Sequence, residues 1–122
     1  MINLKESKPI FIENSKVPAV LSKVAPINIS AITLGLFVFS REAINETTRR
    51  HETIHWQQYI ETLIIGFLFL YLLFWLYGLI KYRGDGKKAY AQIPFEQEAY
   101  HKDIYIDYLE KRKRFTWLKY KV

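Results

Sequence analysis

The sequence predicts a mainly α-helical fold with a small N-terminal β element, an α+β arrangement in one domain. Residues 29–39 carry no charge and are rich in β-branched and aromatic side chains, a pattern typical of a strand. Residues 40–80 contain no proline and have a helical pattern, and a second helical pattern opens at Pro94. A chain of 122 residues is long enough for one domain and too short for two ordinary ones.

Five segments follow from these patterns. Residues 1–39 form the extended or β part, in which Gly35 marks a bulge or a close backbone approach. Residues 40–62 form a helix that Ser40 or Asn45 can cap. Residues 63–80 form an apolar helix without charge, residues 94–114 form another helix, and residues 115–122 form a basic, aromatic tail. A polar connection with two glycines separates the last two helices.

Composition restricts the chemistry of the chain. It has no cysteine, which excludes disulfides and thiolate metal sites, so any metal ligands are His, Asp or Glu side chains. The formal net charge of +6 favours an anionic partner such as a phospholipid surface or a nucleic acid. The first ten residues have mixed charges and no apolar core, so we expect no secretory signal and a cytoplasmic N-terminus.

A five-residue motif, His51-Glu52-Thr53-Ile54-His55, lies in the first predicted helix. Residues four apart share a helix face, so the two imidazoles can bind one Zn²⁺ ion together. Glu52 lies about 100° around the helix from His51, beside the metal, where it can accept a proton from an attacking water. The alternative is three solvated polar residues, which the pairing of two of the three histidines at this spacing disfavours. Gln58 shares the face of His55, as a support, a substrate contact or an ordinary polar neighbour.

Catalytic zinc normally takes a third protein ligand. The spacing alone leaves several candidates in the second half of the chain: Glu96, Glu98, His101, Asp103, Asp107 and Glu110. The acidic residues before the strand are further candidates. Acids in a first helical turn also offset the helix dipole without any metal, which is the alternative explanation for Glu96 and Glu98.

The motif followed by Glu96-x-x-Ala99 resembles the gluzincin arrangement, in which a glutamate from a later helix completes the zinc site. Residues 50–58, the apolar run and residues 89–100 are together similar to a group of small bacterial zincin-like proteins regarded as membrane-associated metallopeptidases. The resemblance covers residues 31–120. It implies a minimal zincin-like helical core with His51 and His55 as zinc ligands, Glu52 as the base and Glu96 as the third ligand.

The sequence departs from that family at one position. Many gluzincins have an acid directly after this alanine, which supports a ligand histidine, whereas this chain has Tyr100. The supporting role is therefore unfilled or passes to another residue, and Glu98 remains an alternative ligand. Tyr100 and His101 are candidate donors to the oxygen that becomes negatively charged during peptide hydrolysis.

The apolar helix and the zinc site constrain each other. If residues 63–80 crossed a bilayer, Glu96 would emerge on the face opposite His51 and His55, because irregular chain cannot return through lipid. We therefore expect a break near Gly66, after which the apolar helix runs back beside the motif helix. That helix would be core on one face and shallowly embedded in a membrane on the other. A wholly soluble core helix is the alternative.

Basic residues gather after the apolar run (Lys81, Arg83, Lys87 and Lys88) and in residues 111–114, which precede the aromatic tail. Lysine and arginine beside aromatics suit a lipid headgroup region, and they also suit single-stranded nucleic acid. The adjacent apolar segment favours the membrane over nucleic acid as partner. We expect a bacterial inner-membrane location.

Two functions are compatible with these patterns. The favoured one is a zinc-dependent metallopeptidase that hydrolyses peptide or protein substrates near a membrane, with an extended substrate adding to the edge of the strand at residues 29–39. The other is a non-catalytic small membrane protein or complex subunit with a retained or vestigial metal site.

Overall fold

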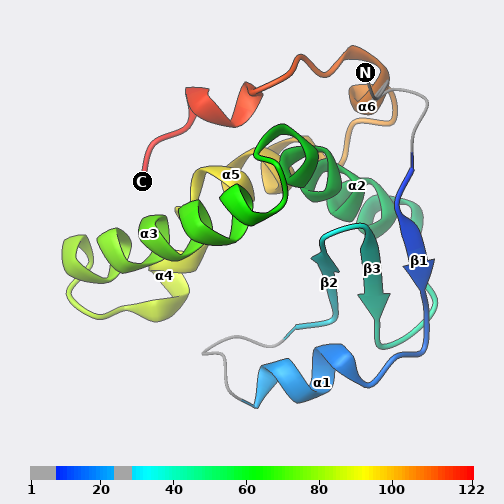
Figure 1. Ribbon diagram of the computed structural model, residues 1–122, viewed down its shortest axis with the longest axis horizontal. Coiled ribbons are helices and arrows are strands. Elements are labelled where there is room, and N and C mark those ends of the chain that lie inside the picture. The colour runs from blue at the N-terminus through cyan, green and yellow to red at the C-terminus, as the bar shows by residue number, and fades with distance from the viewer. Residues whose placement is uncertain (1–7, 24–28) are drawn as a thin grey trace.

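The computed structural model describes residues 8–23 and 29–122, so residues 1–7 and 24–28 of the predicted extended part lie outside it. The fold is mainly helical, with one small sheet near the N-terminus, as the sequence predicts. In Figure 1 the sheet and helix α1 (Val17–Ser22) lie below helix α2 (Glu46–Glu61), and helix α3 (Ile65–Lys81) extends away from them. The C-terminal segment passes over the opposite side of α2 and α3.

The predicted strand at residues 29–39 is two strands, which corrects that prediction. Strands β2 (Ala31–Leu34) and β3 (Phe37–Ser40) pair antiparallel, with Thr33 opposite Val38. Gly35 has a φ of +62° and lies in the turn between them, where glycine adopts positive φ without steric cost. Strand β1 (Ile10–Ile12) pairs parallel to β3 on its other side, so β2 forms one edge of the sheet.

Helix α2 begins six residues later than the predicted residue 40. Asn45 is its N-cap, and the side chain of Asn45 accepts a hydrogen bond from the backbone N–H of Thr48 at 2.8 Å. Ser40 ends β3 instead and is buried. The motif turn therefore lies in the second turn of α2.

The break between α2 and α3 lies at Leu63 and Ile64, before Gly66, and the helix axes differ in direction by 108°. Both residues have positive φ, 59° and 65°, which is unfavourable for side chains of this kind. Gly66 allows the corner to close, because a Cβ there would lie 3.3 Å from the Cβ of Thr62. Since the bend is close to a right angle, α3 does not run back beside α2 as predicted.

Helix α3 packs against helix α4 (Gly86–Ala91), and its aromatic rings contact Phe95 of helix α5 (Pro94–Lys102). At the contact with α4, a Cβ added to Gly78 would lie 2.9 Å from that of Ala89, so the glycine permits the close approach. The buried face of α3 joins an aromatic core in which Phe67 stacks on Tyr59 and on Phe95, with ring centroids 3.8 and 4.4 Å apart. This core ties the corner to the helix that carries Glu96.

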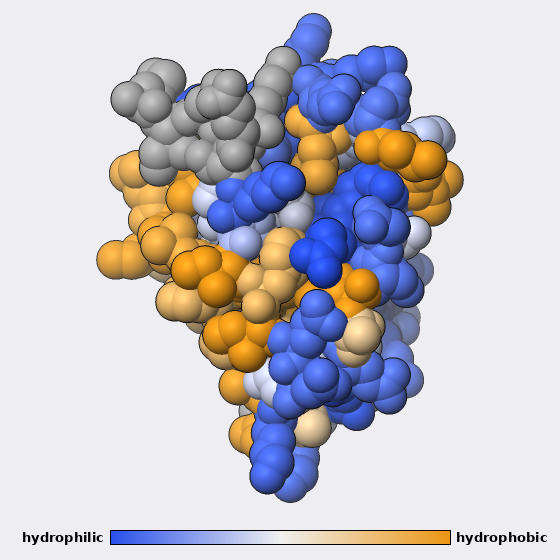
Figure 2. All heavy atoms as spheres, turned by 90° about the vertical axis from the view of Figure 1, so that its right-hand side faces the viewer, coloured by the Kyte–Doolittle hydropathy of each residue, from blue (hydrophilic) through white to orange (hydrophobic). Residues whose placement is uncertain are grey.

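The opposite face of α3 is exposed and wholly apolar; its residues are Ile65, Leu68, Phe69, Leu72, Leu73, Leu76, Tyr77 and Ile80. On the face shown in Figure 2, most apolar side chains gather along the left side and most hydrophilic side chains along the right. Across the described ranges, no single helix is long and apolar enough to cross a membrane. The pair of α2 and α3 taken together meets that length and composition, but the bend separates the two helices.

The predicted helix at residues 94–114 and the tail also differ from expectation. The helix is interrupted after Lys102 and resumes as the short α6 (Tyr108–Lys111). In the tail, the 3₁₀ helix η1 (Thr116–Lys119) places Trp117 in the aromatic core, 4.7 Å from the ring of Phe95. Trp117 is therefore core, and not an interfacial side chain as the sequence pattern indicated.

Candidate metal centre

Helices α2 and α5 bring together three side chains with metal-ligating atoms. His51 and His55 lie one turn apart on α2, and Glu96 lies in the first turn of α5. One atom from each lies within 4.8 Å of the others. The Oε1 of Glu96 is 3.0 Å from Nε2 of His55 and 3.6 Å from Nε2 of His51. All three residues are buried, at 5–8% exposed.

The donor set fits a zinc ion. Tetrahedral zinc with ligand distances of about 2.0–2.1 Å separates neighbouring ligand atoms by roughly 3.3 Å. The two separations at Glu96 Oε1, 3.0 and 3.6 Å, lie on either side of that value. Two imidazoles and a carboxylate leave the fourth position to water, which is the pattern of catalytic zinc sites. His51, His55 and Glu96 would therefore hold the ion.

Each histidine is oriented through its other ring nitrogen. Nδ1 of His51 lies 3.0 Å from Oδ2 of Asp103, and Nδ1 of His55 lies 2.8 Å from Oε1 of Gln58. Both partners accept a hydrogen bond from Nδ1–H, so each Nε2, which faces Glu96, is the nitrogen that would bind a metal. These contacts set the tautomer that metal binding needs.

Asp103 supplies the support that the sequence left unassigned. It follows the end of α5, where the Arg50 side chain donates a hydrogen bond to its backbone carbonyl. The side chain of Asp103 is thereby positioned beside His51, seven residues after Glu96. From the sequence, Asp103 is a candidate ligand and no more, because no residue pattern marks the end of the helix at this position.

Glu52 is buried and anchored to the sheet. The hydroxyl of Thr33, on β2, lies 2.9 Å from Oε2 of Glu52 and 3.0 Å from the backbone oxygen of the same residue. Glu52 is not among the three clustered ligand residues, and its charge contributes to raising the pKa of His55. The carboxylate lines the same cavity as the three clustered residues, and Thr33 restricts its position.

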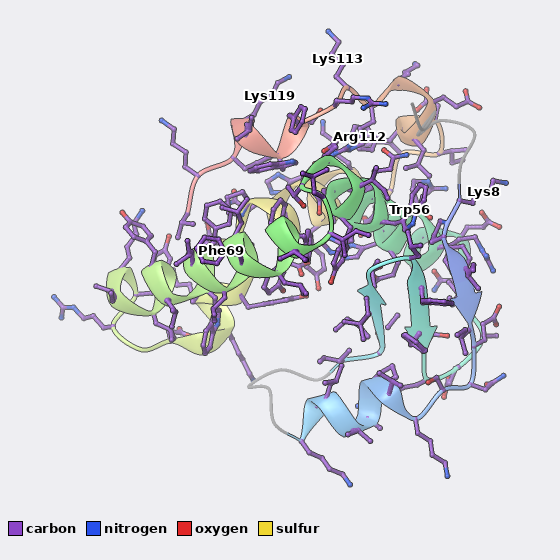
Figure 3. All side chains as sticks on the ribbon, viewed as in Figure 1. Lys8, Trp56, Phe69, Arg112, Lys113 and Lys119 are labelled. Atoms are coloured by element: carbon purple, nitrogen blue, oxygen red, sulfur yellow. The ribbon has the colours of Figure 1, made fainter. Side chains whose placement is uncertain are left out.

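Glu98, the alternative ligand, has other partners. Its carboxylate pairs with Arg112 at 2.6 Å and accepts hydrogen bonds from Tyr108 and from the amide of Gln58. Arg112 also pairs with Glu61 at 2.6 Å, and all three side chains are almost fully buried. In Figure 3, Arg112 points toward α2, whereas the neighbouring Lys113 points away from the molecule. Arg112 is thus part of an internal ion-pair network and not of a basic surface.

Gln58 links this network to the metal centre. Its Nε2 donates to the backbone oxygen of Phe95 at 3.1 Å and to Oε1 of Glu98 at 3.0 Å. Since the nitrogen end of the amide is used there, the oxygen end faces His55. Gln58 therefore orients a candidate ligand, and it is fully buried.

Three tyrosines border the centre. The hydroxyl of Tyr71 donates to Oε2 of Glu96 at 2.7 Å, and the hydroxyls of Tyr90 and Tyr100 are 2.8 Å apart. The ring of Tyr100 also meets that of His51, with centroids 4.5 Å apart. Burial raises the pKa of all three phenols, so they remain neutral hydrogen-bond donors at physiological pH. His101, by contrast, is exposed and its ring lies against Tyr120.

Charge coupling at the centre is strong. Burial lowers the pKa of His55, but the negative charge of Glu96 and the hydrogen bond to it outweigh this effect and raise the value to about 9. Burial likewise raises the pKa of Glu96, and the two histidines more than reverse it, so the pKa is well below its usual range. When no metal is bound, a proton on His55 therefore occupies the position that a cation would take.

A cavity of about 580 Å³ opens beside the centre. Its polar end is formed by the metal cluster, Glu52, Tyr90 and Tyr100. Its remaining wall is mostly apolar, with Ile32 and Leu34 from β2 and Phe67, Leu68, Leu72 and Trp75 from α3. The cavity thus brings together three side chains that could hold a metal ion, the buried carboxylate of Glu52, neutral hydrogen-bond donors and an apolar wall.

Comparison with protein-family models, curated proteins and solved structures gives no match for this chain.

Proposed function

We propose that this protein is a zinc-dependent metallopeptidase that hydrolyses peptide bonds at or near a membrane surface. One observation carries the proposal: two histidines one helical turn apart and a buried glutamate from a separate helix offer three ligand atoms within 4.8 Å of one another. Glu52 lies in the same turn as the histidines but outside the cluster. This division into three ligands and one base is what metal-assisted hydrolysis requires.

The residues around the cavity divide the chemistry among them. The chemistry that zinc supplies at such a site is Lewis acidity, which polarises a peptide carbonyl and lowers the pKa of an attacking water. Glu52 accepts the proton of that water and returns it to the leaving amine, with Thr33 restricting its carboxylate. Tyr100 donates a hydrogen bond to the carbonyl oxygen as charge develops there. The outer edge of β2 pairs with an extended substrate.

Two surface features support a membrane location. The exposed face of α3 is apolar along its whole length, which is more than isolated surface residues account for. At its C-terminal end lie Lys81, Arg83, Lys87 and Lys88, all exposed. An apolar helix face flanked by cations is the arrangement of helices that lie in the interface of an anionic bilayer. Because Arg112 is internal, the second basic segment contributes less to a nucleic-acid surface than its sequence indicates.

The enzymatic part is tested by metal analysis and by Glu52→Gln. The purified protein should bind one zinc ion per chain, and Glu52→Gln should keep the zinc while cleavage of peptide substrates falls by at least about a hundredfold. Glu46→Gln, an exposed position in the first turn of the same helix, is the matched control and should retain activity. If zinc binds and Glu52→Gln changes no cleavage, the protein is instead a non-catalytic membrane protein with a metal site.

The membrane part is tested with vesicles. The protein should sediment with vesicles that contain phosphatidylglycerol, and Arg83→Gln combined with Lys87→Gln should weaken that binding by roughly fivefold for each charge removed. Binding to phosphatidylcholine vesicles should change little. Absence of sedimentation with either vesicle would contradict the membrane location and leave the enzymatic proposal standing.

A further inference from the structure

The wall of the cavity and the exposed apolar face of α3 share two residues. Leu68 and Leu72 line the cavity, and they are also 52% and 53% exposed. They lie one turn apart, between the side chains of α3 that point into the cavity and those that point outward. On the α3 side, the cavity is therefore continuous with the exposed apolar face of the helix through Leu68 and Leu72.

The charges in the cavity lie at one end. Among the described residues that line it, the ionisable acids and histidines belong to the metal centre or contact it, and none is a lysine or arginine. The rest of the wall comes from aliphatic and aromatic side chains and from Ser30, Thr33, Thr47 and Thr48. A bound chain would thus meet apolar surface on the α3 side, and acidic side chains would find no cation apart from the centre itself.

Given the proposed peptidase function, on which this inference rests, we infer that the substrate is an apolar peptide segment that enters from the lipid phase across Leu68 and Leu72. The cavity volume of about 580 Å³ is that of a pocket for a small organic molecule, and so holds several consecutive side chains. Leu68 and Leu72 are apolar and exposed, so an apolar segment that crosses them exchanges lipid contacts for protein contacts.

The edge strand β2 can supply the backbone hydrogen bonds that a peptide segment loses when it leaves the lipid and unwinds. A peptide segment in lipid keeps its backbone groups paired within a helix, and leaving them unpaired is costly. Strand β2 lies at the edge of the sheet and borders the cavity, with Ile32 and Leu34 in its wall. The segment can therefore replace its helical hydrogen bonds with bonds to β2 as it unwinds. An extended backbone is also what the attacking water needs in order to reach the carbonyl.

The test uses two probes and two matched double variants of the full chain. One probe is a peptide with a leucine–alanine core flanked by lysines, and the other has the leucines replaced by serine, both in phosphatidylglycerol vesicles. Leu68→Ser with Leu72→Ser alters the cavity lip. Leu73→Ser with Leu76→Ser removes two leucines of similar exposure, 45% and 42%, from the same helix face outside the cavity. Both variants should lose vesicle affinity equally.

We expect the zinc-loaded protein to cleave the leucine probe at least about tenfold faster than the serine probe, normalised to the protein bound to vesicles. The cavity-lip variant should lose that preference, and the matched variant should keep it. Equal cleavage of the two probes, or a similar loss in both variants, would overturn the inference while leaving the peptidase proposal intact.

Binding gives a readout that does not depend on catalysis. Each double variant is also made in the Glu52→Gln background, and its affinity for a fluorescent form of the leucine probe is measured. The cavity-lip variant should bind at least about tenfold more weakly than the matched variant. If the wild type cleaves neither probe, the peptidase proposal fails, and this comparison still decides whether the cavity takes an apolar segment: equal affinities would overturn the inference.

Discussion

Gln58 accepts a hydrogen bond from Nδ1 of His55 at 2.8 Å, although both residues belong to the same turn of α2. The other end of its amide is bound to Glu98 and to the backbone of α5. The orientation of His55 therefore depends, through Gln58 and Glu98, on the buried ion pairs of Arg112. The acceptor for Nδ1 of His55 is thus a neutral amide, whereas the acceptor for Nδ1 of His51 is the carboxylate of Asp103.

Replacing Gln58 should weaken metal binding. In Gln58→Leu the Nδ1–H of His55 loses its acceptor and the ring is free to rotate, so zinc affinity should fall about 10–100-fold. The measurement is competition with a chelator of known affinity. Gln97→Leu, on α5 and bonded only to backbone oxygens away from the centre, should change affinity less than twofold. Wild-type affinity in a folded Gln58→Leu protein would contradict the positioning role.

Removing Arg112 should destabilise the fold. Arg112→Met leaves Glu61 and Glu98 buried without their cation, and breaking such a pair costs about 3–5 kcal/mol. Chemical denaturation of the zinc-free protein measures this directly. Lys113→Met, at the adjacent exposed position, should stay within about 0.5 kcal/mol of wild type. A loss below 1 kcal/mol in Arg112→Met would show that the network is not as buried as the structure indicates.

Tyr100→Phe should reduce turnover without releasing zinc. The phenol is a neutral donor beside the cluster, and loss of one donor to a developing oxyanion typically costs about a hundredfold in kcat. We expect KM and zinc content to change little. Tyr90→Phe removes the partner hydroxyl and should have the smaller effect. If Tyr90→Phe proves the more damaging change, the donor role belongs to Tyr90.

The zinc-free protein should lose stability as the pH rises. The pKa of His55 is raised from 6.5 to about 9, so its contribution is complete below pH 6.5 and disappears as the pH passes through about 9. The pKa of Glu96 is lowered from 4.5, so its contribution is complete above pH 4.5 and is lost as the pH falls toward its native value. In EDTA, His55 and Glu96 should therefore raise the melting temperature most between about pH 4.5 and 6.5.

Zinc should reverse this trend, because the metal competes with the proton for His55. The rise in melting temperature on adding zinc should grow from pH 5.5 to pH 8.5. In Glu96→Gln the main cause of the raised histidine pKa is gone, so the decline of the zinc-free protein toward pH 9 should flatten. An equally steep decline in that variant would assign it to other groups.

The sequence predicted the features that depend on local chemistry. The His51–His55 spacing, the cap at Asn45 and the helix start at Pro94 each arise within one turn of chain. The coarse fold class was confirmed, and Glu96 lies beside both histidines, as the family resemblance implied. What was missed depends on tertiary contact. A helix break near Gly66 was predicted, and the structure has it at Leu63 and Ile64; the 108° angle was not predicted, because neither residue favours positive φ and the angle depends on how the helices pack.

Long-range polar contacts were missed for the same reason. In the sequence, Thr33 is an ordinary strand residue, and only the fold shows that it contacts Glu52. Arg112 is one of four consecutive basic residues in the sequence, and the fold shows that its side chain is buried against Glu61. Tyr71 belongs to a run that sequence alone treats as uniformly apolar, yet its hydroxyl reaches Glu96. Such pairs are specified by how helices meet, which residue spacing within one helix does not encode.

The corner at Leu63 and Ile64 also sets the angle of α2 to the lipid surface in the proposed membrane-bound state. If α3 lies parallel to the membrane surface, as proposed, the bend of 108° places the axis of α2 nearly along the membrane normal. His55 lies in the C-terminal half of α2, less than two turns from the end of the helix at the corner, and His51 lies one turn farther from it. In the proposed membrane-bound state, the height of His51 and His55 above the bilayer would therefore be set by the number of residues between the motif and the corner.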